Sequence, residues 1–304
     1  MGLSTVSAFK NMSVDESKYV TMTDEQLKEY QHYILDIAKD CIEICEKENI
    51  CYHLTGGSAL GAVRHHGFIP WDDDIDIDIL GQDFERFIDC FSKQYGDKYW
   101  IHTCSTKNYG MTLTRIRLKN SICRTREDVE NDECGFYIDI FRIENAPNNK
   151  VLRIIHGILS MGMGFLLSCR NFYKNRSLMM ELAADNKSLL RTFQIKIGIG
   201  FCLQMFSVQK WAMMTQKIYG MCKNNESKYV TVPAGRNHYF GELYLRDKFV
   251  EFDRKSFEGN LWKIPKAWDL YLTHMYGDYR SLPDKQDREK HIMLELKFPG
   301  EEKI

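Results

Sequence analysis

Apolar residues recur at helical spacing in the segment that follows Thr23. They are Leu27, Tyr30, Ile34, Ile37, Cys41 and Ile44. Thr23 is followed three residues later by Gln26, and this pair matches a capping box, which fixes the first turn of a helix. The pattern therefore predicts a long amphipathic helix that ends near Glu48 and buries one of its faces.

Shorter elements follow, separated by glycine and proline. The pattern predicts a strand over residues 51–55, a helix over 58–65, a strand over 74–80 and an amphipathic helix over 83–95. In the second strand Asp74, Asp76 and Asp78 alternate with isoleucines, which favour extended backbone. Because side chains alternate between the two faces of a strand, the three carboxylates are expected to point to one side.

Two further strand patterns come next. Residues 112–118 alternate, with Arg115 and Arg117 on the same parity. Residues 135–141 are mostly apolar and carry a single acid, Asp139. A buried lone carboxylate costs several kcal/mol unless it is paired or bound to a metal ion, so Asp139 is a candidate for chemistry. The alternative is an edge position that faces water.

Residues 151–222 differ from the rest of the chain by two long apolar stretches, 154–169 and 195–206. The first stretch has 16 residues, whereas a membrane-spanning helix needs about 20. The pattern favours a pair of core helices in a helical subdomain. A surface that docks on a membrane or on a lipid acceptor is the other interpretation. From Lys228 the chain returns to short strands, and one more helix is expected to end at Gly277.

Composition limits the class of protein. The 304 residues are 44% hydrophobic and 27% charged, and the net charge of −1 offers no basic field to attract nucleic acid. Ten cysteines include no CxxC pair, which favours reduced thiols over a disulfide scaffold or a zinc site. Met1 to Thr21 lacks the apolar core of a signal peptide. We therefore expect a cytoplasmic protein that does not bind nucleic acid.

The tripeptide Gly56-Gly57-Ser58 lies between a predicted strand and a predicted helix. Such a turn can present backbone N–H groups, at the positive end of the helix dipole, to an anion. Alone it is weak evidence, because most such tripeptides are plain turns. Here the acidic strand follows 16 residues later, and a row of carboxylates needs a cation such as Mg²⁺. The combination predicts a site for a metal-bound phosphate.

The acidic strand has three rival interpretations. A calcium loop that starts at Asp74 would need glycine at its sixth position, where this chain has Ile79. The Asp-x-Asp pair of a nucleotide-sugar glycosyltransferase is chemically close, because two acids there hold a metal bound to a diphosphate. A solvated acidic edge strand explains poorly why apolar residues surround the acids. Metal-assisted phosphoryl or nucleotidyl transfer is favoured, with Asp139 as a metal ligand or proton acceptor.

The run from Gly57 to Ile77 resembles the signature of the LicD family. This family includes bacterial phosphocholine transferases and, more distantly, the fukutin-related ribitol-phosphate transferases. Tyr137-Ile138-Asp139-Ile140-Phe141 is similar to the second acidic motif of the family. The segment from Ile264 to His291 resembles its closing motif. The resemblance covers roughly residues 25–145 and 228–291.

The resemblance implies an α+β fold of the nucleotidyltransferase type, in which helices flank a mixed sheet, with an additional helical subdomain. The chain then divides into a lead-in, a catalytic core, a helical insertion that shapes the acceptor site and a C-terminal part of the catalytic domain. The corresponding ranges are 1–22, 23–150, 151–227 and 228–304.

The resemblance also implies roles for individual residues. Asp74 and Asp76 would bind Mg²⁺, with Mn²⁺ as an alternative ion, and Asp139 would complete the metal site or act as a base. Asp72 is an assisting carboxylate. Asp78 departs from the family pattern, and the solvated end of the strand is a better explanation for it than an extra metal ligand. The residues expected to bind the donor are Gly56, Gly57, Ser58, Arg64, Arg115 and Arg117. For the two strand arginines, an ordinary surface position is an equal alternative.

The implied reaction is the transfer of phosphocholine, or a related phospho-alcohol. The donor would be CDP-choline or a similar CDP-alcohol, and the acceptor a hydroxyl of a cell-surface glycan, such as lipopolysaccharide, or of its lipid-linked precursor. The expected location is the cytoplasm, with peripheral association at the inner face of the membrane. Two other functions stay open: a nucleotide-sugar-dependent glycosyltransferase with a DxD metal site, and a metal–nucleotide binding protein without turnover.

Overall fold

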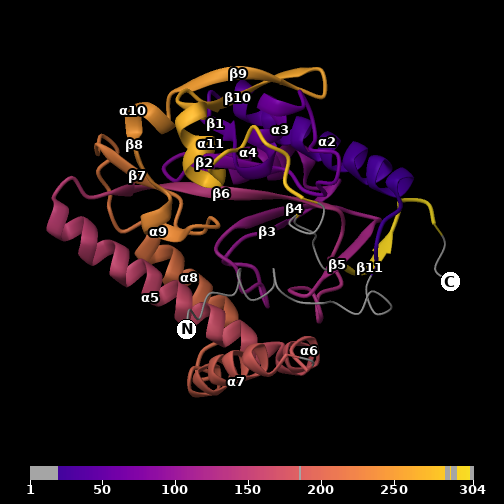
Figure 1. The fold of residues 1–304 in the computed structure, drawn as a ribbon, viewed down its shortest axis with the longest axis vertical. Coiled ribbons are helices and arrows are strands. Elements are labelled where there is room, and N and C mark those ends of the chain that lie inside the picture. The colour runs from indigo at the N-terminus through magenta and orange to yellow at the C-terminus, as the bar shows by residue number, and fades with distance from the viewer. Residues whose placement is uncertain (1–19, 185, 285–287, 289–292, 302–304) are drawn as a thin grey trace.

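The short alternating segments form one mixed sheet. In the computed structural model, which describes residues 20–184, 186–284, 288 and 293–301, the main row of strands has the order β1-β2-β6-β4-β3. These strands are β1 (Tyr52–Leu54), β2 (Asp76–Leu80), β6 (Tyr137–Ala146), β4 (Thr114–Leu118) and β3 (Tyr99–His102). β2 and β6 run parallel, and the other neighbours are antiparallel. Figure 1 shows β6 crossing the middle of the molecule.

The central strand β6 is longer than the sequence predicts. Residues 145–150 were expected to be a linker, but Asn145 and Ala146 belong to β6 and pair with β7 (Tyr229–Thr231). β8 (Leu243–Leu245) then pairs with β7. The linker prediction is wrong at these two positions, because hydrogen bonds from a strand more than 80 residues later extend β6.

Helices flank the sheet. α2 (Asp24–Lys47) begins at the predicted capping box, in which the Gln26 amide donates to Thr23 Oγ1 at 3.2 Å and the Thr23 amide donates to Gln26 Oε1 at 3.0 Å. α2 packs against α4 (Phe84–Tyr95), and α3 (Gly56–Arg64) packs against α11 (Trp268–Tyr276). The predicted α+β fold, with a mixed sheet between helices, is confirmed.

The C-terminal segment returns to the same core. β9 (Phe252–Phe257) and β10 (Asn260–Pro265) form a hairpin beside β1, and Tyr271 of α11 shares one hydrophobic cluster with Tyr30 of α2. The remaining short elements are α9 (His238–Gly241), α10 (Arg246–Phe249) and the pair formed by β5 (Ile122–Thr125) and β11 (Met293–Lys297). Most of the predicted lead-in, and His291 of the closing motif, lie outside the described residues.

A group of helices lies beside the sheet (Figure 1). It consists of α5 (Lys150–Lys174), α6 (Arg176–Leu182), α7 (Lys187–Cys202) and α8 (Val208–Tyr219). α5 packs against both α7 and α8. Small apolar clusters hold these helices together, and one of them contains Phe172, Met179 and Phe193. These residues are not part of the main core cluster of the sheet.

The long helix α5 differs from the sequence prediction in length and burial. It has 25 residues, because the Asn149 side chain accepts hydrogen bonds from the amides of Val151 and Leu152 and the helix continues to Lys174. Within the described part of the chain, it alone is long and apolar enough to cross a membrane by length and composition. Only 22% of its most apolar window is buried, so the prediction of a core helix is wrong for α5.

Candidate active site

Three adjacent strands bring two of the predicted acids together. The parallel register of β2 and β6 pairs Asp76 with Asp139, and the antiparallel register of β4 and β6 pairs Asp139 with Arg115. Arg115 Nε donates to Asp139 Oδ1 at 2.9 Å, and Arg115 Nη2 lies 3.5 Å from Asp139 Oδ2. Asp139 is therefore on a central strand, held in place by a two-point contact, and not on an edge that faces water.

The glycine pair lies directly against the carboxylates. α3 begins at Gly56, two residues before the predicted helix start, and Gly56 has a positive φ of 54°. A Cβ atom at Gly56 would lie 2.8 Å from Asp76 Oδ2, and one at Gly57 would lie 2.7 Å from Asp72 Oδ2. Glycine is needed here because any side chain would meet a carboxylate, and the first turn of α3 thus adjoins the acidic cluster.

These groups open into one cavity of about 670 Å³. Seven of the residues singled out in the sequence line it: Gly56, Gly57, Arg64, Asp72, Asp74, Asp76 and Asp139. Asp74 lies in the segment before β2 and still reaches this wall, although it was expected within the strand. A concave site with convergent carboxylates beside a helix N-terminus is the expected form of a phosphate-binding active site.

The acids repel one another. Burial, together with the charges of Asp74, Asp139 and Asp72, raises the pKa of Asp76 well above its ordinary value. A divalent cation would relieve this repulsion, and carboxylate oxygens are its preferred ligands. No group of three or more His, Cys, Asp or Glu side chains that could hold a metal exists among the described residues. The site therefore fits Mg²⁺ held by one or two carboxylates and completed by substrate phosphates, which is the usual arrangement for this ion.

Comparison with known proteins agrees with this geometry. Residues 49–153, which contain the glycine turn and all four cavity carboxylates, match the family model described as "LicD/FKTN/FKRP, nucleotidyltransferase domain". The chain belongs to the LicD family. It is 27% identical over 283 residues to the lipopolysaccharide cholinephosphotransferase LicD of Haemophilus influenzae, a match that covers 88% of this chain and 97% of that protein.

Shorter matches concentrate the similarity. An uncharacterised protein of Rickettsia prowazekii is 45% identical over 74 residues, which are 22% of this chain and 28% of that protein. Another from Rickettsia typhi is 41% identical over 90 residues, or 27% of this chain and 29% of its own length. The predicted resemblance to the LicD family is confirmed by the family model and the full-length relative together.

In this LicD-family site, the two predicted strand arginines are buried supports. Arg117 is fully buried and donates from Nη2 to Asp128 Oδ1 at 2.8 Å, while Arg115 Nη1 lies 3.8 Å from Asp128 Oδ2. Both guanidinium groups lie over the ring of Tyr137, at 4.1 and 5.0 Å from its centroid. They share a face, as predicted, but they do not line the cavity and are not surface residues. Their contacts orient Asp139.

Two other predicted donor-binding residues make structural contacts. Ser58 is buried, and its Oγ accepts a hydrogen bond from the Asp76 amide at 2.9 Å, which ties α3 to β2. Arg64 lines the cavity, and its Nη1 donates to the carbonyl oxygens of Tyr279 and Ser281 at 2.8 and 3.2 Å. Arg64 therefore anchors the C-terminal loop over the cavity. Its role in donor binding stays a prediction.

The interpretation of Asp78 as a solvated strand end is wrong. Asp78 is fully buried, with its Oδ2 3.9 Å from Nδ1 of the equally buried His53, and neither of its oxygens has a hydrogen-bond partner in the described structure. Burial raises the pKa of Asp78 well above its ordinary value and lowers the pKa of His53 to about 3. The neutral forms of both groups are thus favoured. β2 is covered on both edges, by β1 and β6, so its later residues are inside the fold.

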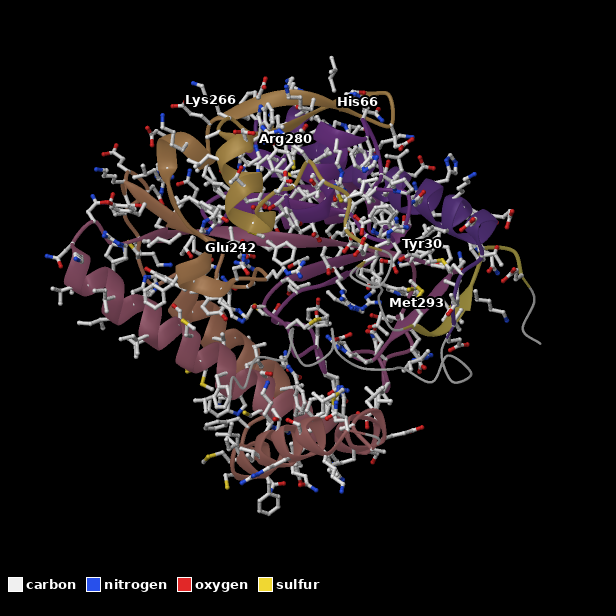
Figure 2. All side chains as sticks on the ribbon, viewed as in Figure 1. Tyr30, His66, Glu242, Lys266, Arg280 and Met293 are labelled. Atoms are coloured by element: carbon white, nitrogen blue, oxygen red, sulfur yellow. The ribbon has the colours of Figure 1, made fainter. Side chains whose placement is uncertain are left out.

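Sequence reasoning missed several residues of this site. The Tyr271 hydroxyl lies 2.6 Å from Thr55 Oγ1 and accepts a hydrogen bond from the Gly56 amide at 2.8 Å. Tyr271 belongs to the segment that resembles the closing motif, which was the available signal. Glu242, labelled at the centre of Figure 2, also lines the cavity, and burial raises its pKa to about 7. No local pattern around Glu242 distinguished it from a surface acid.

Proposed function

We propose that this protein is a transferase that moves phosphocholine, or a related phospho-alcohol, from a CDP-linked donor to a hydroxyl of lipopolysaccharide or of its lipid-linked precursor. The observation that carries the proposal is the match to the cholinephosphotransferase of H. influenzae, which covers 97% of that protein. The acidic cavity beside the first turn of α3 supports it, because that arrangement suits a nucleoside diphosphate with a divalent ion.

The donor would lie with its diphosphate at the N-terminus of α3. Gly57 leaves room there for close approach of phosphate oxygens, and Asp74 and Asp76 would hold Mg²⁺, with Mn²⁺ as the alternative ion. When bound, the ion would neutralise charge on the phosphate oxygens. Asp72, directly opposite Gly57, would orient the same region. The Tyr271 hydroxyl occupies the Gly56 amide, so the donor would meet the later amides of this turn.

The transfer itself replaces one phosphorus–oxygen bond with another. The acceptor hydroxyl oxygen bonds to the phosphorus of phosphocholine, the bond from that phosphorus to the bridging oxygen of the diphosphate breaks, and CMP leaves. The hydroxyl proton must go to a base. Asp139 faces the cavity with 14% of its side chain exposed and is oriented by Arg115, so it would accept this proton or complete the metal site.

The acceptor would lie in an adjoining cavity of about 620 Å³. Leu113, Arg126 and Ala234 line both cavities and mark the place where they meet. The second cavity is walled by the helical subdomain through residues such as Phe165 and Lys196, which agrees with the prediction that this segment shapes the acceptor site. Its largely apolar wall, with a few polar groups, suits an amphipathic glycan precursor.

The test is CMP release by the purified protein from CDP-choline with Mg²⁺ and lipopolysaccharide that lacks phosphocholine. Release should need all three components and should stop when EDTA removes the ion. The Asp76→Asn variant should lose it, whereas Asp40→Asn, on the outer side of α2, should not. Release that continues at full rate in EDTA would contradict the metal assignment.

The choice of donor can be tested without an acceptor. CDP-choline, CDP-ethanolamine, CDP-glycerol and CDP-ribitol with Mg²⁺ should be compared by thermal shift, because a ligand raises the melting temperature as its concentration exceeds Kd. We expect stabilisation by CDP-choline or by one of its relatives. Stabilisation by UDP- or GDP-sugars, with none from any CDP-alcohol, would favour the glycosyltransferase instead.

A further inference from the structure

One face of α5 is apolar and open to solvent along four helical turns. Its large side chains are between 43% and 64% exposed. They are Val151, Leu152, Ile154, Ile155, Ile158, Leu159 and Met161. We call this set the α5 face. No charged residue lies between Arg153 and Arg170. Contiguous exposed apolar surface of this kind marks a contact with a membrane or a partner.

The opposite side of the same helix is attached to the protein. His156 Nε2 lies 2.8 Å from the Ile218 carbonyl oxygen of α8, and Asn171 Nδ2 donates to the Gly110 carbonyl oxygen at 2.6 Å. Gly157 and Ser160 are buried between these contacts. α5 is thus fixed along one side, and only the α5 face is available to another molecule. This geometry suits a helix that lies along a surface better than one that crosses a bilayer.

The helices that pack on α5 continue the apolar character. Ile195 and Phe201 of α7 are 46% and 54% exposed, Met205 in the turn after α7 is 76% exposed, and Met213 of α8 is 47% exposed. α7 and α8 both contact α5. The exposed apolar side chains therefore come from three helices of one subdomain, which widens the surface beyond a single stripe.

Charge distinguishes this subdomain from the rest of the chain. Residues 150–222 contain ten Lys and Arg but two Asp and Glu, a net charge of +8, whereas the whole chain is −1 and the remainder is therefore −9. Several of the cations are exposed, namely Lys150, Arg176, Lys187, Arg191, Lys210 and Lys217. An apolar helix face within a cationic frame is complementary to an anionic lipid surface, where each basic residue adds about 1 kcal/mol of attraction.

We propose that the α5 face docks on an anionic lipid bilayer and lies at the boundary between headgroups and acyl chains. The exposed cations contact anionic headgroups, while the sheet stays outside the bilayer. The docking itself does not depend on the reaction. If the proposed function also holds, docking places the acceptor cavity next to the bilayer, because Met161 belongs to the α5 face and also lines that cavity. A lipid-linked acceptor would then reach the donor without leaving the membrane.

The experiment is sedimentation of the full chain with vesicles, in the absence of nucleotide. Vesicles of phosphatidylcholine alone should be compared with vesicles that contain about one third phosphatidylglycerol. Binding should be clearly stronger on the anionic vesicles and should weaken at high salt, because salt screens the headgroup charge. Equal binding to both vesicle types, or no binding to either, would overturn the proposal.

The variants separate this face from general stickiness. Ile155→Asp with Ile158→Asp changes two exposed positions and should lower the partition coefficient about tenfold or more, since each loses apolar insertion. The matched control is Leu261→Asp with Leu270→Asp, two side chains that are both 66% exposed on β10 and α11. The control should bind like the parent protein. Equal losses in both double variants would refute the assignment.

Two other occupants of the face are separable outcomes. Size-exclusion chromatography should show no change in oligomeric state for Ile155→Asp with Ile158→Asp. A dimer that this variant dissociates, without vesicle binding by the parent protein, would identify a second copy as the occupant. Alkaline carbonate should release the protein from cell membranes, and retention after this treatment would overturn surface docking in favour of a membrane span. Because no donor is present in the vesicle experiment, its failure leaves the proposed reaction untouched.

Discussion

Arg115 Nε donates a hydrogen bond to Asp139 Oδ1 at 2.9 Å, between the neighbouring strands β4 and β6. Both side chains are largely buried, at 8% and 14% exposure. We expect Arg115→Met to destabilise the fold by about 3 kcal/mol, because it leaves the carboxylate without its partner in a poorly solvated place. Urea unfolding measures this loss, and CMP release should fall in the same variant.

The control for this ion pair is Arg124→Met. Arg124 pairs with Glu295 at 3.0 Å, but Glu295 is 48% exposed. Exposed pairs contribute about 1 kcal/mol or less, so this variant should remain near parental stability. If Arg115→Met were no more costly than Arg124→Met, Asp139 would not depend on Arg115.

Two acids on the same strand should respond differently to an isosteric change. Asp76→Asn should lower metal-dependent CMP release about 100-fold or more, since it removes a proposed ligand. Asp78→Asn should stay within a few-fold of the parent, because burial already favours the neutral form of Asp78 beside His53. Steady-state kinetics with varied Mg²⁺ distinguishes the two. Equal losses would mean that Asp78 takes part in the reaction.

Gly57 can be tested with a single methyl group. Gly57→Ala would put a Cβ atom 2.7 Å from Asp72 Oδ2, and the flexible Asp72 side chain can move away. We therefore expect little change in stability but a loss of CDP-choline affinity of about tenfold, equivalent to ~1.4 kcal/mol. Calorimetric titration gives the affinity. Gly162→Ala is the matched helical control, because nothing lies within 4 Å of its added Cβ atom. Unchanged affinity in Gly57→Ala would place the donor elsewhere.

Lys196 predicts a pH dependence of stability. It is 1% exposed, its Nζ donates to Ser168 Oγ at 3.0 Å, and burial lowers its pKa from 10.5 to about 8. Between these two values the unfolded chain binds the proton and the folded chain does not, so Lys196 makes stability rise with pH in this window. The rise should approach ~3 kcal/mol at most.

The measurement is urea unfolding at several values between about pH 7 and 10, the window that the two pKa values define. Other groups titrate there too, so the parent protein must be compared with Lys196→Met. The stability of the parent should increase relative to the variant as pH rises. A constant difference between the two proteins would show that the folded-state pKa of Lys196 is not lowered.

Local patterns predicted most elements of this fold but not their partners. The capping box at Thr23 and the alternation around Asp76 depend on neighbours in the chain, and both predicted elements are present. The parallel pairing of Asp76 with Asp139 joins residues 63 positions apart, and no local rule contains it. The extra length of β6 has the same origin, because a distant strand supplies its hydrogen bonds.

The site divides in a similar way. Asp76 and Asp139 could be identified because acids among isoleucines need an explanation. Alternation gives the face of a side chain but not its depth, and for this reason Asp78 was assigned to solvent while the structure buries it. Arg115 and Arg117 were considered as phosphate ligands because their charge is visible in the sequence. Their partner Asp128 was not singled out, since an acid in a polar loop is ordinary.

The contact between Tyr271 and the Gly56 amide has a consequence for protein synthesis. The two residues are 215 positions apart, so the first turn of α3 lacks its hydroxyl partner until nearly the whole chain has left the ribosome. A nascent or truncated chain that ends before α11 would have the acids and the glycines but an incomplete turn beside them. The cell is thereby protected from unfinished copies that could consume an activated nucleotide without delivering its cargo.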